Sequence, residues 1–330
     1  MTDLTRRSAL GTVAAAALAP FAVPSLAQAA APLGGKQAPG FYRYKIGDFE
    51  ITAVTDGITV TPRPDNYVAN ASKDEVGAVF AAHHLPSDKA TQTYTPVVVN
   101  TGPKLVVIDT GLGPATYAQS KGALGQFQTN FRAAGFDPAQ VDVVIISHFH
   151  GDHINGLIGA DGKSLYPNAE VMVPAAEWKF YMDDGEMSKA TGTPQENNFK
   201  NSRRVFDALG RKVTQFDAGK EVTSGITAIA TPGHTVGHTS FVVASGSDKV
   251  FVQADITAGA AFLFVKNPDW HLQFDADKPL AVQTRRKMYD MAIAEKMPIQ
   301  AFHAAFPGVV NVEKDGNGYR WIPVTWNSAM

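Results

Sequence analysis

The chain has 330 residues, 45% of them hydrophobic, enough to bury a large core in one large domain or two smaller ones. Its 29 Lys and Arg against 31 Asp and Glu give a net charge of −2, and the absence of a long basic run argues against nucleic acid binding. It contains no cysteine, which excludes disulfides and thiolate metal ligands, so any metal must be held by nitrogen and oxygen.

The first 29 residues resemble an export signal. Arg6 and Arg7 precede an apolar run at 9–23, and Ala27-Gln28-Ala29 supplies small residues for cleavage after Ala29. The paired arginines favour a twin-arginine-type signal peptide over 1–29, with an ordinary secretory signal as the alternative. Because the run is short and rich in alanine, we expect no stable membrane anchor and a periplasmic or secreted mature protein.

Beyond the signal, the pattern is that of an α/β domain. Residues 30–40 predict a flexible lead-in. Apolar or alternating runs predict strands at 41–46, 49–55, 95–102, 104–111, 143–148, 170–174, 226–232, 239–245, 249–255 and 298–303. Helical patterns lie near 115–134, 174–182, 197–209 and 278–296. Because strands and helices interleave in both halves and no linker divides them, we expect 41–330 to form a single layered α/β domain.

Three polar stretches interrupt or border these elements. Residues 60–77 and 183–198 predict long loops that border a pocket. The cluster Arg285-Arg286-Lys287, within the last helical pattern, predicts a solvated helix face.

Histidine is concentrated in 147-SHFHGDHINGL-157, directly after an apolar strand. In an extended segment His148 and His150 project to the same side, so both can hold one ion. Gly151 permits a turn that brings Asp152 and His153 round at the start of a helix. The loop therefore predicts two neighbouring sets of metal ligands.

Further candidate ligands follow three other predicted strands. These residues are His234, Asp255 and His303. Open α/β sheets gather their ligands at the ends of strands, so we expect these side chains to converge on the histidine-rich loop.

The succession of these motifs resembles that of the metallo-β-lactamase-fold hydrolases. The matching segments are HFHGDH at 148–153, TPGHTVGH at 231–238, Asp255, His303 and VVIDTGLG at 106–113. The resemblance extends across nearly all of 41–326 and implies an α/β fold of four layers, an αβ/βα sandwich with two metal ions at the seam. It also implies three ligands for the first ion, three for the second and one bridging residue: His148, His150 and His234; Asp152, His153 and His303; and Asp255.

For five other residues we expect roles other than metal binding. We expect His238 to form hydrogen bonds behind the ligands rather than to bind metal. Asp109 of the DTG motif is interpreted as a structural or outer carboxylate, and His83 and His84 as surface residues. His271 fits either a pocket or a structural role.

Two divalent ions about 3.5 to 4 Å apart can share a water, lower its pKa and yield a hydroxide nucleophile. Asp255 would orient that hydroxide and Asp152 would receive a proton. Nitrogen and oxygen ligands suit zinc, which we expect, and also cobalt, manganese or iron. Hydrolysis of a small-molecule ester, lactone or phosphotriester is therefore the predicted chemistry.

The predicted substrates follow from a finer resemblance. Relatives that open β-lactams usually place cysteine or serine where this chain has Asp255, which argues against a β-lactamase. The opening 40–57 and the ending 303–326 are similar to methyl parathion hydrolase and to related lactonases and arylesterases. We therefore predict a hydrolase of lactones or aryl esters with promiscuous hydrolysis of organophosphate triesters.

An apolar substrate pocket is predicted beside the ions. Its candidate residues are all aromatic: Phe149, Trp178, Phe262, Phe264, Trp270 and Phe274. The alternatives are a dedicated phosphotriesterase and, ranked below it, a thioesterase, a β-lactamase, a non-catalytic metal-binding protein or a redox di-iron protein. The family resemblance also suggests a homodimer.

Overall fold

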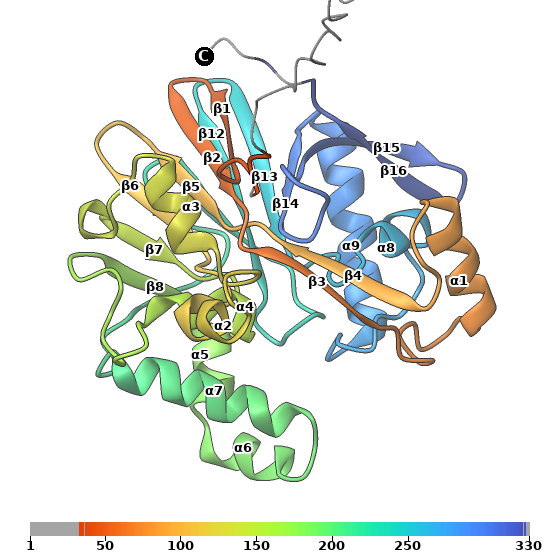
Figure 1. The fold of residues 1–330 in the computed structure, drawn as a ribbon, viewed down its shortest axis with the longest axis horizontal. Coiled ribbons are helices and arrows are strands. Elements are labelled where there is room, and N and C mark those ends of the chain that lie inside the picture. The colour runs from red at the N-terminus through yellow and green to blue at the C-terminus, as the bar shows by residue number, and fades with distance from the viewer. Residues whose placement is uncertain (1–32, 36, 326, 328–330) are drawn as a thin grey trace, which may run out of the picture. The chain divides into compact units, whose positions relative to one another are not determined.

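The computed structural model describes residues 33–35, 37–325 and 327. The predicted signal peptide at 1–29 lies outside the described residues, as do positions 30–32 and 36 of the predicted lead-in. From Pro39 onward the described residues form one compact unit, whose helices and strands are labelled in Figure 1.

Two large mixed sheets and one hairpin make up the strands of the described chain (Figure 1). The first sheet contains, in spatial order, β1 (Phe41–Ile46), β2 (Phe49–Val54), β5 (Val97–Asn100), β6 (Leu105–Ile108), β7 (Val143–Ile145), β8 (Glu170–Pro174) and β9 (Thr214–Phe216). The second contains β10 (Glu221–Thr223), β11 (Ile226–Ala230), β12 (Thr239–Ser245), β13 (Asp248–Ala254), β14 (Ile299–Ala301), β15 (Val309–Asp315) and β16 (Gly318–Pro323). The hairpin pairs β3 (Gly57–Pro62) with β4 (Lys89–Tyr94).

Helices cover the outer faces of both sheets. The α-helices of the described residues are α1 (Lys73–Ala82), α2 (Gly113–Gln119), α3 (Phe127–Ala133), α4 (Gly151–Ile154), α5 (Ala175–Tyr181), α6 (Asp184–Ala190), α7 (Gln195–Ala208), α8 (Phe262–Lys266) and α9 (Lys278–Ala294). Phe131, Phe199 and Phe206 pack from α3 and α7 onto the outer face of the first sheet. Met288 and Tyr289 of α9 pack onto the outer face of the second.

The inner faces of the two sheets pack against each other. Val106 and Ile145 of the first sheet share one apolar cluster with Phe241 and Val252 of the second. Burial of each such side chain stabilises the fold by roughly 1.5 to 3 kcal/mol. The layers therefore run helix, sheet, sheet, helix, and the predicted four-layer αβ/βα sandwich is confirmed.

Strand direction brings the predicted ligand segments to one edge of each sheet. β6 and β7 run parallel, so the DTG motif and the histidine-rich loop leave the first sheet on the same side. In the second sheet β13 and β14 are parallel. β11 has the same direction as β13, because each is antiparallel to the strand between them.

Most predicted strands agree with the structure to within a few residues. The helical pattern at 115–134 is two helices, α2 and α3, rather than one.

The loop predicted at 60–77 is correct for 63–72, which contain no helix or named strand, and wrong at its ends, whereas the loop predicted at 183–198 is mostly helical. Residues 60–77 include the start of α1, where Ser72 and Glu75 form a capping box. Residues 183–198 include α6 and the start of α7, and the Asp183 side chain accepts a hydrogen bond from the Glu186 N–H at 2.8 Å. Neither segment shows strong apolar periodicity, so the capping residues were the available signals.

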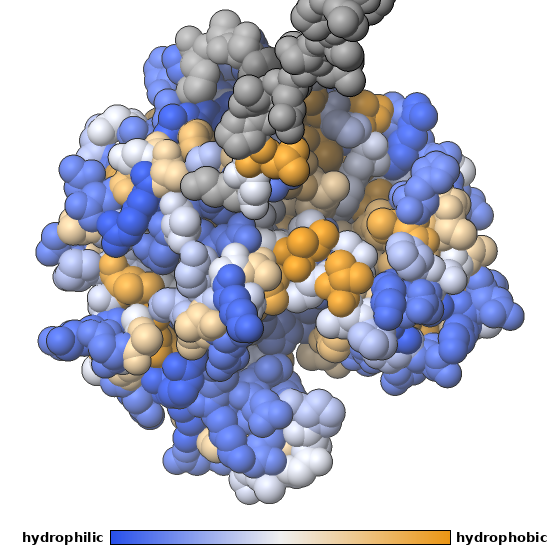
Figure 2. Space-filling model, viewed as in Figure 1, coloured by the Kyte–Doolittle hydropathy of each residue, from blue (hydrophilic) through white to orange (hydrophobic). Residues whose placement is uncertain are grey.

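Within the described residues, no helix has the length and apolar character needed to cross a bilayer. On the face shown in Figure 2, apolar residues form small separate groups in a largely polar surface.

Candidate metal centre

The histidine-rich loop starts where β7 ends. His150 has extended backbone geometry (φ −71°, ψ 154°), and α4 begins at the next residue. His148 and His150 therefore precede the helical turn, whereas Asp152 and His153 lie on it. The Thr110 N–H donates to the His153 carbonyl at 2.9 Å and holds this turn against the DTG motif.

The other predicted ligands reach the same place from the second sheet. His234 lies in the turn after β11, Asp255 follows β13 directly, and His303 lies two residues after β14. Ala254 has a positive φ of 50°, an uncommon conformation for a residue with a side chain, and it turns Asp255 out of the strand direction.

The seven predicted ligands form two groups that share one member. His148, His150, His234 and Asp255 offer ligand atoms that all lie within 4.8 Å of one another. Asp152, His153, Asp255 and His303 form the second group under the same limit. Asp255 is the shared residue, as expected of a side chain that bridges two ions.

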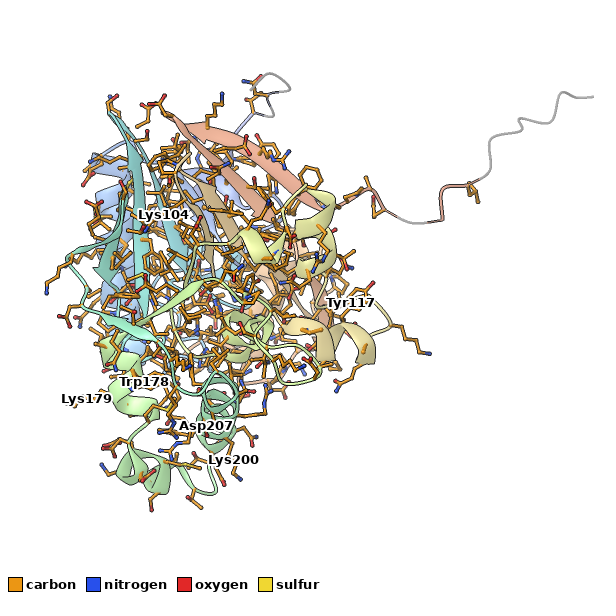
Figure 3. The ribbon with its side chains drawn as sticks, turned by 90° about the vertical axis from the view of Figure 1, so that its left-hand side faces the viewer. Lys104, Tyr117, Trp178, Lys179, Lys200 and Asp207 are labelled. Carbon is orange, nitrogen blue, oxygen red and sulfur yellow. The ribbon has the colours of Figure 1, made fainter. Side chains whose placement is uncertain are left out.

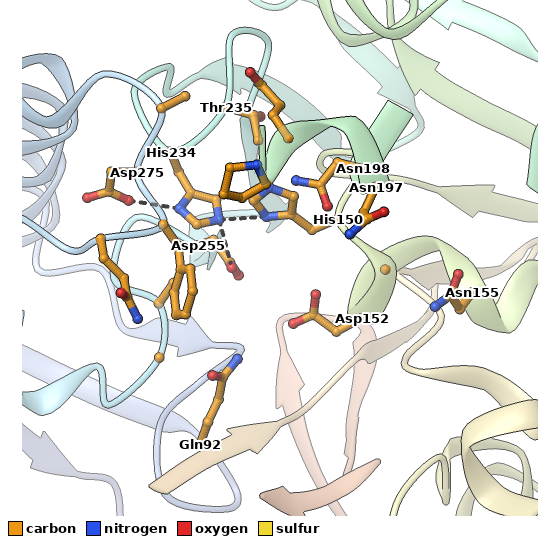
Figure 4. A pocket seen from close by; sticks show the side chains of 18 of the residues that line it. Gln92, His150, Asp152, Asn155, Asn197, Asn198, His234, Thr235, Asp255 and Asp275 are labelled. Carbon is orange, nitrogen blue, oxygen red and sulfur yellow. Dashed lines mark hydrogen bonds and ion pairs between the residues drawn. The ribbon is translucent and has the colours of Figure 1, made fainter. Parts of the chain in front are cut away.

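Distances around Asp255 describe the centre. Its Oδ2 lies 3.2 Å from His234 Nε2, 3.1 Å from His303 Nε2 and 3.8 Å from His148 Nε2. Its Oδ1 lies 3.2 Å from His153 Nε2. In Figure 4 the Asp152 and Asp255 carboxylates point toward each other beneath the His150 and His234 rings.

Buried atoms without hydrogen bonds support metal binding. His148 Nε2, His153 Nε2 and Asp255 Oδ1 are buried and have no hydrogen-bond partner. Leaving a buried polar atom unpaired is costly, and one cation in each ligand group would together satisfy all three. The donor set of imidazole nitrogens and carboxylate oxygens therefore fits two adjacent divalent ions.

The outward-facing nitrogens of three histidines have fixed acceptors. His153 Nδ1 lies 2.8 Å from Asp109 Oδ2, and His303 Nδ1 lies 2.6 Å from the Thr93 carbonyl oxygen. His234 Nδ1 lies 2.8 Å from Asp275 Oδ1. Such contacts favour the Nδ1–H tautomer, which leaves the Nε2 lone pair toward the centre.

Asp109 and His238 lie behind the ligands, in line with the expectation for both. Asp109 has a φ of 61° and accepts hydrogen bonds from the Ser147 N–H and hydroxyl, both at 2.8 Å. The Asp255 N–H donates to His238 Nε2 at 2.9 Å, and His238 Nδ1 lies 2.9 Å from the Thr231 carbonyl. His238 thus holds the backbone of Asp255 and has no nitrogen left for a metal.

The electrostatics of the centre suit cations. Burial lowers the pKa of His150 to about 3. Burial also acts to lower the pKa of His234, but contacts with Asp255 and Asp275 outweigh it and raise that pKa to about 9. Burial acts to raise the pKa of Asp152, yet His153 outweighs it and lowers that pKa to about 2. The carboxylates thus draw positive charge into the centre, and metal binding would release protons from it.

Glu177, which no sequence motif indicated, connects the two ligand loops. This fully buried carboxylate on α5 accepts the Phe149 N–H at 3.1 Å and the Gly237 N–H at 2.6 Å. One acceptor therefore holds both the histidine-rich loop and the loop that contains His234. An acidic residue between apolar neighbours in 174-PAAEWKFY-181 was the available signal.

Asp56 is a second missed carboxylate. It is fully buried and accepts the Leu112 N–H at 2.6 Å and the Phe127 N–H at 2.7 Å, so it joins the DTG turn to the start of α3. Burial, only partly offset by these two donors, raises the pKa of Asp56 from 3.8 to about 7.

This shift predicts a pH-dependent stability. Because the folded-state pKa lies above the unfolded value, Asp56 contributes stability below about pH 4 that is lost as the pH rises through about 7. The loss for this group is roughly 4 kcal/mol of unfolding free energy. Asp56→Asn cannot titrate and should show a flatter slope between pH 4 and 8 in urea unfolding. Asp48→Asn, at an exposed turn, should keep the wild-type slope, and equal slopes for all three proteins would contradict the assignment.

A cavity of about 840 Å³ opens onto the centre. Four residues of the ligand groups line it, His150, Asp152, His234 and Asp255, together with Asp275, which supports His234. The rest of the wall is mainly small or uncharged polar: Gln92, Tyr94, Leu112, Gly151, Asn155, Tyr181, Thr193, Pro194, Gln195, Asn197, Asn198, Thr235, Ala258, Gly259, Gln273, Phe274 and Ala276. Figure 4 shows Asn197 and Asn198 beside His150, with Gln92 on another side.

Of the six predicted pocket aromatics, only Phe274 lines this cavity, and its side chain is 52% exposed. Phe149 and Phe264 are wrong as pocket residues because both are fully buried in apolar clusters.

Trp178 is also wrong, because it packs on Phe206 between α5 and α7, whereas its neighbour Lys179 is exposed (Figure 3). Phe262 and Trp270 pack around the α1 and α8 cluster instead.

The remaining histidines lie away from the cavity. His83 and His84 are exposed, as predicted, and the His83 ring lies against the Phe262 ring with centroids 4.4 Å apart and the planes tilted by 33°. His271 does not line the cavity, and its backbone pairs with Asn70 and Ala69. The structure therefore favours the structural role for His271.

Comparison with known sequences gives a family match and partial relatives. The profile of the Metallo-beta-lactamase superfamily matches residues 91–293. The chain is 35% identical over 118 residues to the N-acyl homoserine lactonase AttM of Rhizobium johnstonii, covering 34% of this chain and 39% of that protein. It is 25% identical over 217 residues to an N-acyl homoserine lactonase of Bacillus sp, covering 63% of this chain and 75% of that protein.

Solved structures share the fold. AidC, described as a dizinc quorum-quenching lactonase, is 24% identical with a TM-score of 0.79, and the match covers 88% of this chain and 99% of AidC. The hydrolase AbOPH of the beta lactamase superfamily is 26% identical with a TM-score of 0.79, covering 89% of this chain and 100% of AbOPH.

Proposed function

The chain belongs to the metallo-β-lactamase superfamily, and from its side-chain geometry we propose that it is a metal-dependent hydrolase of lactones or aryl esters. The proposed cofactors are two divalent ions, expected to be zinc. The observation that supports this most directly is Asp255, which belongs to both ligand groups and opens onto the cavity.

The protein's own residues have separable roles in this proposal. His148, His150 and His234 would hold the first ion, and Asp152, His153 and His303 would hold the second. Two divalent ions bound there supply Lewis acidity and lower the pKa of water. Asp255 orients the attacking water through its two carboxylate oxygens. The side chain of Asp152 is 17% exposed, against 3% for Asp255. In this proposal Asp152 receives the proton that the attacking water releases.

The cavity wall favours an uncharged substrate. None of its lining residues in the described chain is Lys or Arg. A glutathione thioester or a β-lactam with its carboxylate would gain from such a cation, whereas a neutral lactone or ester needs none. The carboxamides of the wall offer hydrogen bonds to neutral groups, and Phe274 offers one exposed apolar ring.

A substrate panel on purified, metal-analysed protein tests the proposal. The panel contains dihydrocoumarin, an alkyl lactone, phenyl acetate, paraoxon, a glutathione thioester and a β-lactam. We expect the highest kcat/KM for a lactone or phenyl acetate and slower turnover of paraoxon. A higher kcat/KM for paraoxon than for every lactone and ester would assign a phosphotriesterase instead, and no turnover of any compound would refute hydrolysis.

Export and association belong to the same proposal. We propose that residues 1–29 direct twin-arginine export and are removed after Ala29, which the N-terminal sequence of periplasmic protein would test. We also propose a homodimer, which light scattering of the purified protein would test.

A further inference from the structure

Arg285 of α9 is buried, contrary to the solvated face predicted for its cluster. Its relative exposure is 1%, whereas the neighbouring Arg286 side chain is 33% exposed and pairs with Asp269. Burying a guanidinium is expensive unless its donors are paired. Two adjacent arginines on one helix thus have different surroundings.

The guanidinium of Arg285 gathers the segment that follows Asp255. Its Nε donates to the Ile256 carbonyl at 3.1 Å, and Nη1 donates to the carbonyls of Pro268 at 2.6 Å and Trp270 at 3.1 Å. The group also lies 5.1 Å from the Phe264 ring centroid. This segment includes the cavity residues Ala258, Gly259, Gln273 and Phe274, so one buried cation holds a wall of the cavity together.

The fourth contact of Arg285 leads to a proposed ligand. Its Nη2 lies 3.5 Å from Asp275 Oδ2, and the other oxygen of Asp275 lies 2.8 Å from His234 Nδ1. Two backbone bonds join the same loops, from the Ala276 N–H to the His234 carbonyl at 3.1 Å and from the Asp277 N–H to the Gly233 carbonyl at 2.9 Å. The imidazole of His234 is thus oriented from behind by a carboxylate that a buried cation holds.

We propose that Arg285 and Asp275 are a positioning pair that orients His234 and so determines how tightly the first ligand group binds its ion. Asp275 accepts the Nδ1 proton, which leaves Nε2 as the ligand atom and increases its donor strength. Arg285 compensates the buried charge of Asp275 and keeps that carboxylate beside the ring. The second ligand group has its own supports, Asp109 and the Thr93 carbonyl, and does not use this pair.

The inference rests on the proposed two-ion centre but not on any substrate. Zinc stoichiometry and the two stepwise zinc affinities, measured by chelator competition without substrate, are therefore suitable readouts. Asp275→Asn keeps the shape of the side chain and removes its charge, and we expect one of the two affinities to fall about 10-fold. Asp275→Ala should lower the same affinity up to about 100-fold, and the other affinity should stay within about 2-fold of wild type.

Arg285→Lys retains a charge but lacks the planar donors for four contacts, and we expect a loss between wild type and Asp275→Ala. Arg286→Lys, one position along the helix, is the matched control and should bind both ions as wild type does. If Arg285→Lys fails to fold by circular dichroism, Asp275→Asn decides the matter alone. The positioning role is refuted if Asp275→Asn and Asp275→Ala bind both ions normally, or if Arg286→Lys causes an equal loss.

This experiment separates the positioning pair from the proposed function. A wild-type protein that binds two zinc ions and hydrolyses no ester would refute the proposed function and leave the positioning pair standing. A wild-type protein that binds no pair of ions would refute both.

Discussion

Asp255→Ala is expected to lose both metal ions and to lower kcat/KM by at least about 10³-fold. The reason is geometric, because Asp255 is the one described side chain that belongs to both ligand groups. Its two oxygens lie within 3.8 Å of four imidazole nitrogens. Without this carboxylate, each group keeps three ligands, but the negative charge that the two groups share is lost.

Metal content and turnover are measured together on the same preparation of Asp255→Ala. Asp248→Ala is the matched control, because Asp248 is exposed at the opposite end of β13 and should leave both quantities unchanged. Asp255→Asn keeps the side-chain volume, so its metal content and turnover should lie between those of Asp255→Ala and Asp248→Ala. Two fully occupied ion sites in Asp255→Ala would show that the residue does not bridge.

His150→Ala is expected to lose one ion and to lower kcat/KM by about 10³-fold or more. His150 belongs to the first ligand group alone, and its Nδ1 lies 2.9 Å from His234 Nε2. The second group, centred on Asp152 and His303, stays complete in this variant. One ion per chain is therefore the expected stoichiometry, in contrast to none for Asp255→Ala.

The control for this variant is His271→Ala, since that side chain lies outside the cavity. It should keep two ions and near-normal kcat/KM. Near-normal activity of His150→Ala with two bound ions would remove His150 from the centre.

Local sequence was sufficient for the histidine-rich loop. Its four candidate ligands fall within six consecutive positions, so their proximity follows from chain connectivity and from the alternation of an extended backbone. The same holds for Asp255, which follows β13 directly at the edge where parallel strands end. Such features need only the conformation of a few neighbouring residues.

The sequence predicted the pocket residues poorly, and the alternation of side chains in the same loop explains one of the errors. Phe149 stands between His148 and His150 in sequence, and the same alternation that directs both histidines inward sends its ring the other way, onto Phe206 of α7. Trp178 and Phe264 are aromatic residues near the motifs that pack into clusters on the outer layers. Aromatic character alone does not tell a core residue from a pocket residue, because both environments favour it.

The supporting carboxylates required the full structure. Glu177 is 28 residues from Phe149 and 60 residues from Gly237, and Asp275 is 41 residues from His234. The sequence predicted that Arg285 is part of a solvated basic cluster. Its burial follows from the packing of α9 against the segment after Asp255.

The amino-acid sequence by itself determined the fold class, the ligand candidates and the strand ends from which they project, because these depend on local periodicity and short motifs. Only the tertiary structure decided which residues line the cavity, that His238 supports Asp255, and that Arg285 is buried behind Asp275. Those outcomes depend on how layers far apart in the chain pack, and packing selects among side chains that are chemically alike in sequence.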